Sequence, residues 1–345
     1  MQNSNSMTQQ LLSAWDRAVV EGRLVNEFQA DKEDAQGQWA KGDRIIFGIR
    51  QQEGRNRYYA HNLTQDSEIE SDVEEREIEM PGPGKNFTCQ FNGYRALRPG
   101  GSRKPLGRQV DISPAAADCR FFCQDGDRPL SLLARDPLLQ KPLSHFIWKA
   151  YYNAAPIVPN GHFLWVPTQK QNELTHLLQV LTLPILEDAF ALFQQLSGSL
   201  LFFNSLHSGA SVNHIHFQSM MSDRLLPAET FPLTPQPNAD YSIPKDYPAY
   251  LMVFEPDSSA SRVFAHIDRL QNQGIPFNLM MTPRLIILVP RNIDFEIVSE
   301  FPGNGLAGLG MCGRLIVIDR DAYISADYTR IQSAFKKMSY CLSSS

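Results

Sequence analysis

Two histidines and a glutamine occupy alternate positions in one short stretch of the chain: His214, His216 and Gln218. In a β-strand these side chains would project from one face, while Ile215 and Phe217 would project from the other. A neutral imidazole is both a competent nucleophile and a common metal ligand. The spacing therefore predicts a strand with one chemically active face and one apolar face.

A run of small residues lies just upstream of this predicted strand. Ser208, Gly209, Ala210 and Ser211 carry little side-chain bulk, so their backbone N–H groups can approach a ligand closely, as in loops that bind phosphate. Asn204 precedes the run and adds a carboxamide. The pattern predicts an anion-binding loop that leads directly into the strand with the nucleophile.

The residue types alone leave other functions open. Histidines two positions apart also form metal-ligand pairs in zinc sites, so His207 or His266 could complete a metal shell with His214 and His216. That arrangement would suit a metallohydrolase or a metal-binding protein. The same histidines could instead be structural, or belong to a nucleotide sensor without catalytic activity.

The same residues carry a family resemblance. The stretch from His214 to Gln218, with Asn204, Gly209 and Ser211 before it, resembles the His-x-His-x-Gln signature of the galactose-1-phosphate uridylyltransferase branch of the histidine-triad superfamily. The resemblance extends over about residues 146–221, so it is more than a match to one motif.

Two subfamilies of that branch look most similar. Residues 208–211 and 277–291 resemble the diadenosine tetraphosphate phosphorylases, which are also called ATP adenylyltransferases, whereas residues 213–218 resemble the GDP-hexose phosphorylases. The resemblance therefore implies a nucleotidyltransferase of the phosphorylase type. It leaves open whether the substrate is a dinucleoside polyphosphate or a nucleotide sugar. In the second case the protein would be a GDP-hexose phosphorylase or a sugar-1-phosphate nucleotidyltransferase.

Further binding residues follow from the resemblance. An Asn-x-x-Pro and a Gly-His-x-Leu-x-x-Pro motif place Asn153 and His162 at positions that imply contact with the nucleotide and proximity to the active strand. Asn278 and Arg284 lie in a predicted hairpin and are expected to donate hydrogen bonds to the leaving or accepting group. Each of these residues could equally be a strand-end or turn residue.

The resemblance also implies a mechanism in which His216 attacks the α-phosphorus and forms a covalent nucleotidyl-histidine. The carbonyl near His214 would fix the tautomer of His216, and Gln218 would bind a phosphate oxygen. Asn204 and the loop at 208–211 would stabilise the charge on the phosphoryl group. In this superfamily, glutamine at the third position goes with transfer to phosphate. We therefore expect a nucleotide and inorganic phosphate as substrates, and no cofactor or bound metal.

The composition is that of an ordinary globular protein. The chain has 345 residues, of which 43% are hydrophobic and 20% charged, and its formal net charge is −5, which argues against a nucleic-acid partner. Residues 1–10 are polar and no long apolar segment follows, so we expect no membrane partner. Five cysteines without a Cys-x-x-Cys motif favour the reducing cytoplasm. The oligomeric state is left unknown.

Many short predicted strands mixed with a few predicted helices indicate the α+β class, and the resemblance implies histidine-triad-like antiparallel sheets in two related halves. We expect four regions: an N-terminal part of the catalytic domain at 1–145, a catalytic core at 146–226, a proline-rich linker at 227–248, and a C-terminal α+β half at 249–345, which resembles the C-terminal domain of ATP adenylyltransferases.

Several elements are predicted from periodicity and turn residues. Residues 11–28 and 171–196 show helical patterns, the second interrupted by Pro184, and residues 44–63 read as a hairpin. The acidic stretch at 66–79 is predicted to be a solvated excursion. Residues 98–105 form a basic, glycine-containing loop, whose Arg103 and Lys104 could reach over a polyphosphate.

Overall fold

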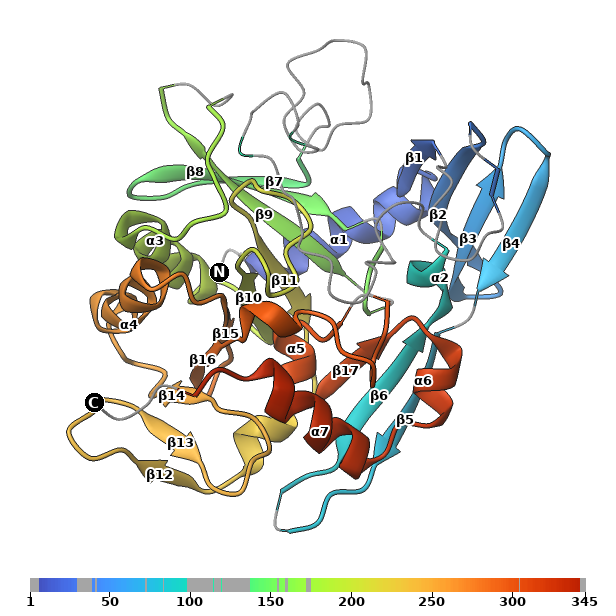
Figure 1. The fold of residues 1–345 in the computed structure, drawn as a ribbon. Coiled ribbons are helices and arrows are strands. Elements are labelled where there is room, and N and C mark those ends of the chain that lie inside the picture. The colour runs from blue at the N-terminus through green and yellow to red at the C-terminus, as the bar shows by residue number, and fades with distance from the viewer. Residues whose placement is uncertain are drawn as a thin grey trace.

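The protein has a mixed α+β fold, as the sequence predicts (Figure 1). The computed structural model describes residues 6–29, 39–40, 42–71, 73–82, 84–97, 114, 119, 137–153, 155–158, 161–171, 175–303 and 305–341. The predicted basic loop, including Arg103 and Lys104, lies outside the described residues.

A ten-stranded antiparallel sheet forms the centre of the molecule. In spatial order its strands are β12 (Leu233–Pro235), β13 (Ser242–Pro244), β14 (Met252–Phe254), β16 (Ile286–Pro290), β15 (Phe277–Met281), β10 (Ser199–Asn204), β11 (Phe217–Met221), β9 (His162–Gln169), β8 (Phe146–Tyr152) and β7 (Leu139–Pro142). Strand β10 pairs with β15, so segments far apart in the chain meet at the middle of one sheet. Residues 227–248 supply β12 and β13 at one edge.

Two smaller sheets flank the large one. A four-stranded antiparallel meander contains β1 (Val25–Gln29), β2 (Arg44–Gln52), β3 (Arg55–Asn62) and β4 (Ser67–Ser71). A three-stranded sheet contains β5 (Val73–Ile78), β6 (Phe87–Asn92) and β17 (Arg314–Val317), with β17 parallel to β6. The β2–β3 pair confirms the predicted hairpin.

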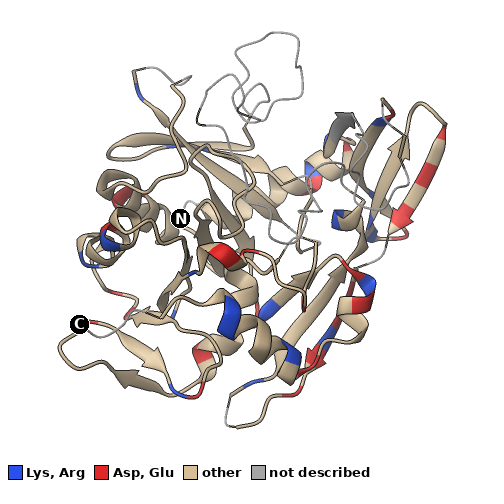
Figure 2. Ribbon diagram, in the orientation of Figure 1, with Lys and Arg blue, Asp and Glu red and all other residues tan. Residues whose placement is uncertain are grey.

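The acidic stretch at 66–79 is not the irregular excursion that its charge suggested. It forms β4 and β5, which pair with β3 and β6, and the core contacts of Ile69 and Ile78 hold these strands on the protein. The glutamates of both strands are exposed, and Figure 2 shows the acidic positions along them. Charge density alone therefore misled the prediction, since the backbone makes the hydrogen bonds of strand pairing whatever side chains it carries.

Helices cover the sheets on several sides (Figure 1). They are α1 (Met7–Val20), α2 (Gly93–Ala96), α3 (Leu183–Phe193), the 3₁₀ helices η3 (Pro227–Thr230) and η4 (Ile293–Phe295), α4 (Ala260–Asn272), α5 (Gly308–Met311), α6 (Arg320–Ile324) and α7 (Tyr328–Met338). Throughout the described part of the chain, no helix is both long and apolar enough to cross a membrane.

Two predicted helices are shorter than their periodicity suggested. Helix α1 ends at Val20 because Gly22 follows with a φ of 66°, a conformation that terminates helices. Helix α3 begins only at Leu183, with Pro184 in its first turn, where proline is tolerated because its missing N–H would have no helical partner. The chain at 175–182 is consequently irregular, which matters for the site described below.

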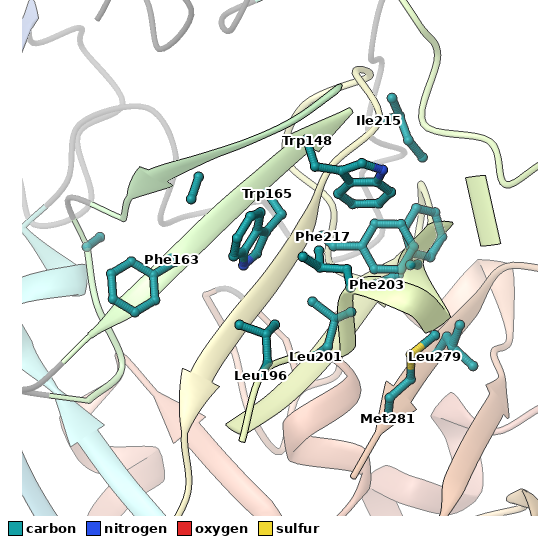
Figure 3. Close-up of a cluster of buried hydrophobic side chains, with 14 of the residues drawn as sticks. Trp148, Phe163, Trp165, Leu196, Leu201, Phe203, Ile215, Phe217, Leu279 and Met281 are labelled. Carbon is teal, nitrogen blue, oxygen red and sulfur yellow. The ribbon is translucent and has the colours of Figure 1, made fainter. Parts of the chain in front are cut away.

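The central strands are buried on both faces. On one face, Leu201, Phe203 and Phe217 pack with Trp148 and Trp165 in a cluster that also includes residues of α1, α3 and α4 (Figure 3). On the other face, alternate residues of the same strands, such as Leu200, Phe202 and Met220, pack with residues of β6, β17, α5 and α7. The polar residues of the candidate site lie on this second face.

Candidate active site

Strand β11 begins at Phe217, so the predicted strand face shared by His214, His216 and Gln218 is wrong. Residues 211–216 instead approach the irregular segment before α3. The N–H of Ile215 donates to the carbonyl of Leu177 at 2.8 Å. This hydrogen bond takes the place of strand pairing at Ile215. The two imidazoles therefore separate: His214 turns toward Cys119 and His176, while His216 stays beside the strand.

The chain itself fixes the tautomer of His216. Its Nδ1 lies 2.8 Å from the carbonyl oxygen of His214, and because a carbonyl can only accept, Nδ1 carries the proton. Burial lowers the pKa of His216 to about 4, so the ring is neutral near pH 7. The lone pair then resides on Nε2, which is the form that a nucleophilic imidazole requires.

A second histidine orients Gln218. The N–H of Ile157 donates to Nδ1 of His162 at 3.2 Å, so in the neutral ring the proton is on Nε2, which donates to Oε1 of Gln218 at 2.9 Å. Burial and the positive charges of Arg95 and Arg314 lower the pKa of His162 to about 3. The neutral tautomer thus turns the Nε2 end of the Gln218 carboxamide away from His162.

Asn153 lies at the edge of this group. Its Nδ2 is 3.4 Å from His162 Nε2, a weak contact because that nitrogen already carries a proton. Its Oδ1 accepts from the N–H of Ala155 at 3.0 Å, and its own N–H donates to the carbonyl of His162. The structure thus brings Asn153, His162 and Gln218 together, and it places His162 beside β11, near the predicted active strand.

Asn204 and Asn278 form a second pair of oriented amides on neighbouring strands. Asn278 is completely buried, and its Nδ2 donates to Oδ1 of Asn204 at 2.8 Å. Phe202 of β10 pairs with Gln218 of β11, so extending the antiparallel register by two residues places Asn204 opposite His216 and on the same face of the sheet. Along this extended register, the Asn204 carboxamide lies across from His216, and Gln218 follows two positions later on the same face.

Gln179 links the segments of Asn204 and His216 at the point where the strand register ends. The sequence did not predict this role. Oε1 of Gln179 accepts from the N–H of His216 at 2.9 Å, and its Nε2 donates to the carbonyl of Asn204 at 2.7 Å. This buried carboxamide takes the place of a strand-to-strand pairing and holds Asn204 and His216 at a fixed separation. The sequence predicted a helix over 171–196, in which the backbone groups would bind one another. That prediction gave no reason to expect the Gln179 side chain to bind the backbone of another segment.

The predicted anion loop is occupied by groups of the protein itself. The hydroxyl of Ser208 is buried and donates to backbone carbonyls, including that of Phe277 at 2.7 Å. The N–H of Gly209 donates to Oε1 of Glu296 at 3.0 Å. Ala210 is buried and Ser211 is exposed. A phosphate at the Gly209 amide would therefore have to replace the Glu296 carboxylate.

Arg284, the arginine predicted to bind, lies apart from the candidate site, whereas Arg291, to which no role was assigned, contacts it. Arg284 is exposed in the turn between β15 and β16, and no described contact joins it to the histidines. Arg291, just after β16, is 1% exposed and donates from Nη1 to Oδ1 of Asn278 at 2.7 Å. A buried arginine has no distinctive sequence pattern, so only the fold reveals it.

One group of described side chains could hold a metal ion. Cys119, His176 and His214 offer a thiolate and two imidazole nitrogens that lie within 4.8 Å of one another, and these are ligand types that zinc prefers. This group differs from the predicted one, because it includes neither His216 nor His207. His266, on helix α4, contacts the exposed Asp240 instead.

A pocket of about 620 Å³ opens beyond the far end of β11. Both signs of charge line it, with Arg224 and Arg314 close to Glu75. Its lining includes none of the predicted site residues. Arg314 nevertheless lowers the pKa of His162, so the basic side of the pocket lies within electrostatic reach of the site.

No profile of a known protein family matches the chain, and no curated protein matches its sequence. Among solved structures, the chain is similar to yeast Ap4A phosphorylase Apa2 in complex with Ap4A, with a TM-score of 0.53 and 18% identity over 78% of this chain and 90% of that one. It is also similar to a crystal structure of yeast Ap4A phosphorylase Apa2, with a TM-score of 0.51 and 16% identity over the same shares. At such identities the likeness establishes the fold alone, and it agrees with the predicted α+β class.

Proposed function

We propose that the protein is a nucleotidyltransferase of the phosphorylase type, which cleaves a dinucleoside polyphosphate with inorganic phosphate. The observation that carries this proposal is the 2.8 Å bond from His216 Nδ1 to the carbonyl of His214, because it directs the lone pair of a neutral imidazole to Nε2. A shared fold with yeast Ap4A phosphorylase Apa2 supports the choice of substrate class.

The first step is attack of His216 Nε2 on an α-phosphorus. A nitrogen–phosphorus bond forms, the bond from that phosphorus to the bridging oxygen breaks, and the remaining nucleoside polyphosphate leaves with the bond's electron pair. The imidazole gains positive charge in the adduct, which the His214 carbonyl stabilises through Nδ1–H. In the second step an oxygen of inorganic phosphate displaces the imidazole and releases a nucleoside diphosphate.

Two oriented amides would stabilise the charge on the phosphoryl oxygens in both steps. His162 binds the oxygen of the Gln218 carboxamide, and Asn278 binds that of Asn204. The NH₂ group of each carboxamide therefore already faces away from these partners. Donors that need no rearrangement are the main source of stabilisation in such transfers. Both carboxamides are neutral, so neither would compete as a general base to activate water, which favours transfer to phosphate.

The nature of the nucleotide can be read from the covalent adduct. The wild-type protein, mixed separately with diadenosine tetraphosphate and GDP-glucose without phosphate, should gain the mass of one AMP from the first compound by intact-protein mass spectrometry. A gain of one GMP from the second would instead establish the alternative, a GDP-hexose phosphorylase or sugar-1-phosphate nucleotidyltransferase. No adduct with either compound would contradict the proposed mechanism.

A second candidate function, favoured by the Cys119, His176 and His214 group, is metal binding. His214 would contribute its ring to the metal, whereas its backbone carbonyl binds His216 Nδ1, so a metal there and a nucleophilic His216 are compatible. In a metallohydrolase, by contrast, the metal would be essential and no nucleotide would become attached.

Elemental analysis distinguishes these cases. If the group binds zinc, the purified protein should contain close to one zinc per chain, and His176→Ala should lose most of it. His145→Ala is the matched control, because His145 pairs with the exposed Glu187. Zinc content that is negligible in the wild type, or unchanged in His176→Ala, would remove this metal site.

A further inference from the structure

Arg291 is a buried guanidinium beneath the candidate active site. It is 1% exposed, and although Glu296 is close enough to raise its pKa, burial has the larger effect and lowers that pKa to about 10. No direct ion pair joins Arg291 to a carboxylate within the part of the chain that is described. Burying a charged guanidinium without such a pair is costly in free energy. The hydrogen bonds that Arg291 does make therefore indicate what the buried side chain is for.

The hydrogen bonds of Arg291 connect the end of α7 with Asn278. Nε of Arg291 donates to the carbonyl of Met338 at 3.3 Å, which anchors the guanidinium to the end of α7. Nη1 donates to Oδ1 of Asn278 at 2.7 Å. Because a guanidinium can only donate, the oxygen of the Asn278 carboxamide must face Arg291 and its NH₂ group must face the other way.

The orientation passes from Asn278 to Asn204. Nδ2 of Asn278 donates to Oδ1 of Asn204 at 2.8 Å and to the carbonyl of Ser208 at 2.7 Å. The N–H of Gly308 points at the same Asn204 oxygen from 3.4 Å. With its oxygen held by these donors, Asn204 turns its own NH₂ group away from Asn278. This is the group that lies across from His216 in the extended register described above.

We propose that Arg291 is a positioning residue, which acts through Asn278 to hold the Asn204 NH₂ group as a donor to the phosphoryl group on His216. This inference rests on the proposed function. Without the guanidinium, the buried Asn278 oxygen would lose its donor, and only the Ser208 carbonyl would still favour the native orientation of that carboxamide. Asn204 would then present its oxygen to the phosphate in part of the molecules. A carboxamide oxygen there would repel the phosphoryl group.

A double-mutant cycle tests the relay. The rate constant for nucleotidyl-His216 formation is measured in single turnover by mass spectrometry for wild type, Arg291→Met, Asn204→Ala and the double variant. Asn204→Ala should lose about 10²–10³-fold, the loss expected for one donor, and Arg291→Met about 10–100-fold. The double variant should be no slower than Asn204→Ala alone. Arg291→Lys should recover part of the rate, because an ammonium can still donate to Asn278.

Arg76→Met is the matched control. Arg76 also donates to backbone carbonyls, those of Tyr323 and Ala326, but at strand β5. It should lower the thermal midpoint without changing the rate per folded molecule. If Arg291→Met does not fold, Asn278→Asp asks the same question, since it keeps an acceptor for Arg291 and removes the donor to Asn204, and it should lose at least as much rate.

Three results would overturn the inference. Losses that add in the double variant, or a wild-type rate in Arg291→Met or Asn278→Asp, would show that Arg291 does not act through Asn204 and would leave the proposed function intact. Absence of any adduct on the wild-type protein would instead overturn the proposed function and the inference together.

Discussion

Replacing His216 by alanine should abolish formation of the nucleotidyl adduct and reduce phosphorolysis by at least about 10⁴-fold, the scale seen when a covalent nucleophile is removed. The reason is that no other described imidazole has the same arrangement. His162 uses both ring nitrogens in bonds to Ile157 and Gln218, and the ring of His214 turns toward Cys119 and His176. Mass spectrometry and release of nucleoside diphosphate provide the two measurements.

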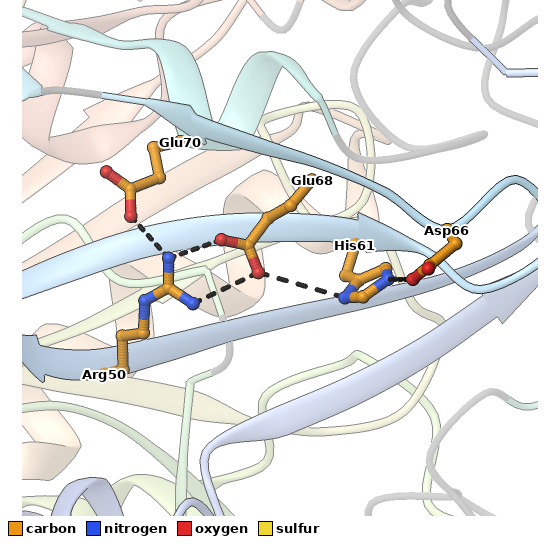
Figure 4. Close-up of polar contacts among 5 residues, drawn as sticks. All are labelled: Arg50, His61, Asp66, Glu68 and Glu70. Atoms are coloured by element: carbon orange, nitrogen blue, oxygen red, sulfur yellow. Dashed lines mark hydrogen bonds and ion pairs between the residues drawn. The ribbon is translucent and has the colours of Figure 1, made fainter.

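A suitable control is His61→Ala. His61 lies in an exposed cluster with Arg50, Asp66 and Glu68 on the meander sheet (Figure 4), where its Nε2 is 3.2 Å from Asp66 Oδ1. Its removal should change neither the adduct nor the turnover. Full turnover of His216→Ala would exclude His216 as the nucleophile and would return the choice to the metal-binding or sensor alternatives.

The parts of the fold that depend on local pattern were predicted well. Alternation and turn residues identified the hairpin of β2 and β3, and mixed short strands and helices identified the α+β class. The pairing of β10 with β15 joins residues far apart in the sequence, such as Phe202 and Met280, which are 78 positions apart, and no local pattern encodes such a contact. Where a local pattern competed with tertiary pairing, as at β4, β5 and residues 175–182, the local prediction failed.

The candidate site shows the same division. His216 and Gln218 were predicted from their spacing, and Asn204 and His162 from the family resemblance. In the structure, His162 contacts Gln218 and the strand of Asn204 pairs with that of Gln218. Gln179 could not be predicted in this way. Like Arg291 and Glu296, it is an ordinary polar residue that acquires a role only because folding buries it against the backbone or side chains of the site.

Gln218→Glu should reduce the rate of adduct formation by about 10²–10³-fold although it preserves the shape of the side chain. One oxygen of the new carboxylate can still accept from His162 Nε2, as Gln218 Oε1 does at 2.9 Å. The other oxygen replaces an NH₂ donor and faces the phosphoryl group with negative charge. The substitution therefore removes one attraction and adds one repulsion, at a position where both act on the transition state.

The pH profile separates this explanation from a loss of folding. A carboxylate next to His162 favours the charged imidazole, so the pKa of His162 should rise from its value of about 3. As pH falls, a proton shared by this pair cancels the added negative charge, and the residual rate of Gln218→Glu should increase. The wild-type rate should stay nearly constant between pH 8 and about 6, since His216, with a pKa of about 4, remains neutral there. Gln195→Glu, in the turn after α3, should behave like the wild type. A rate in Gln218→Glu that equals that of the wild type would show that Gln218 does not contact the phosphoryl group.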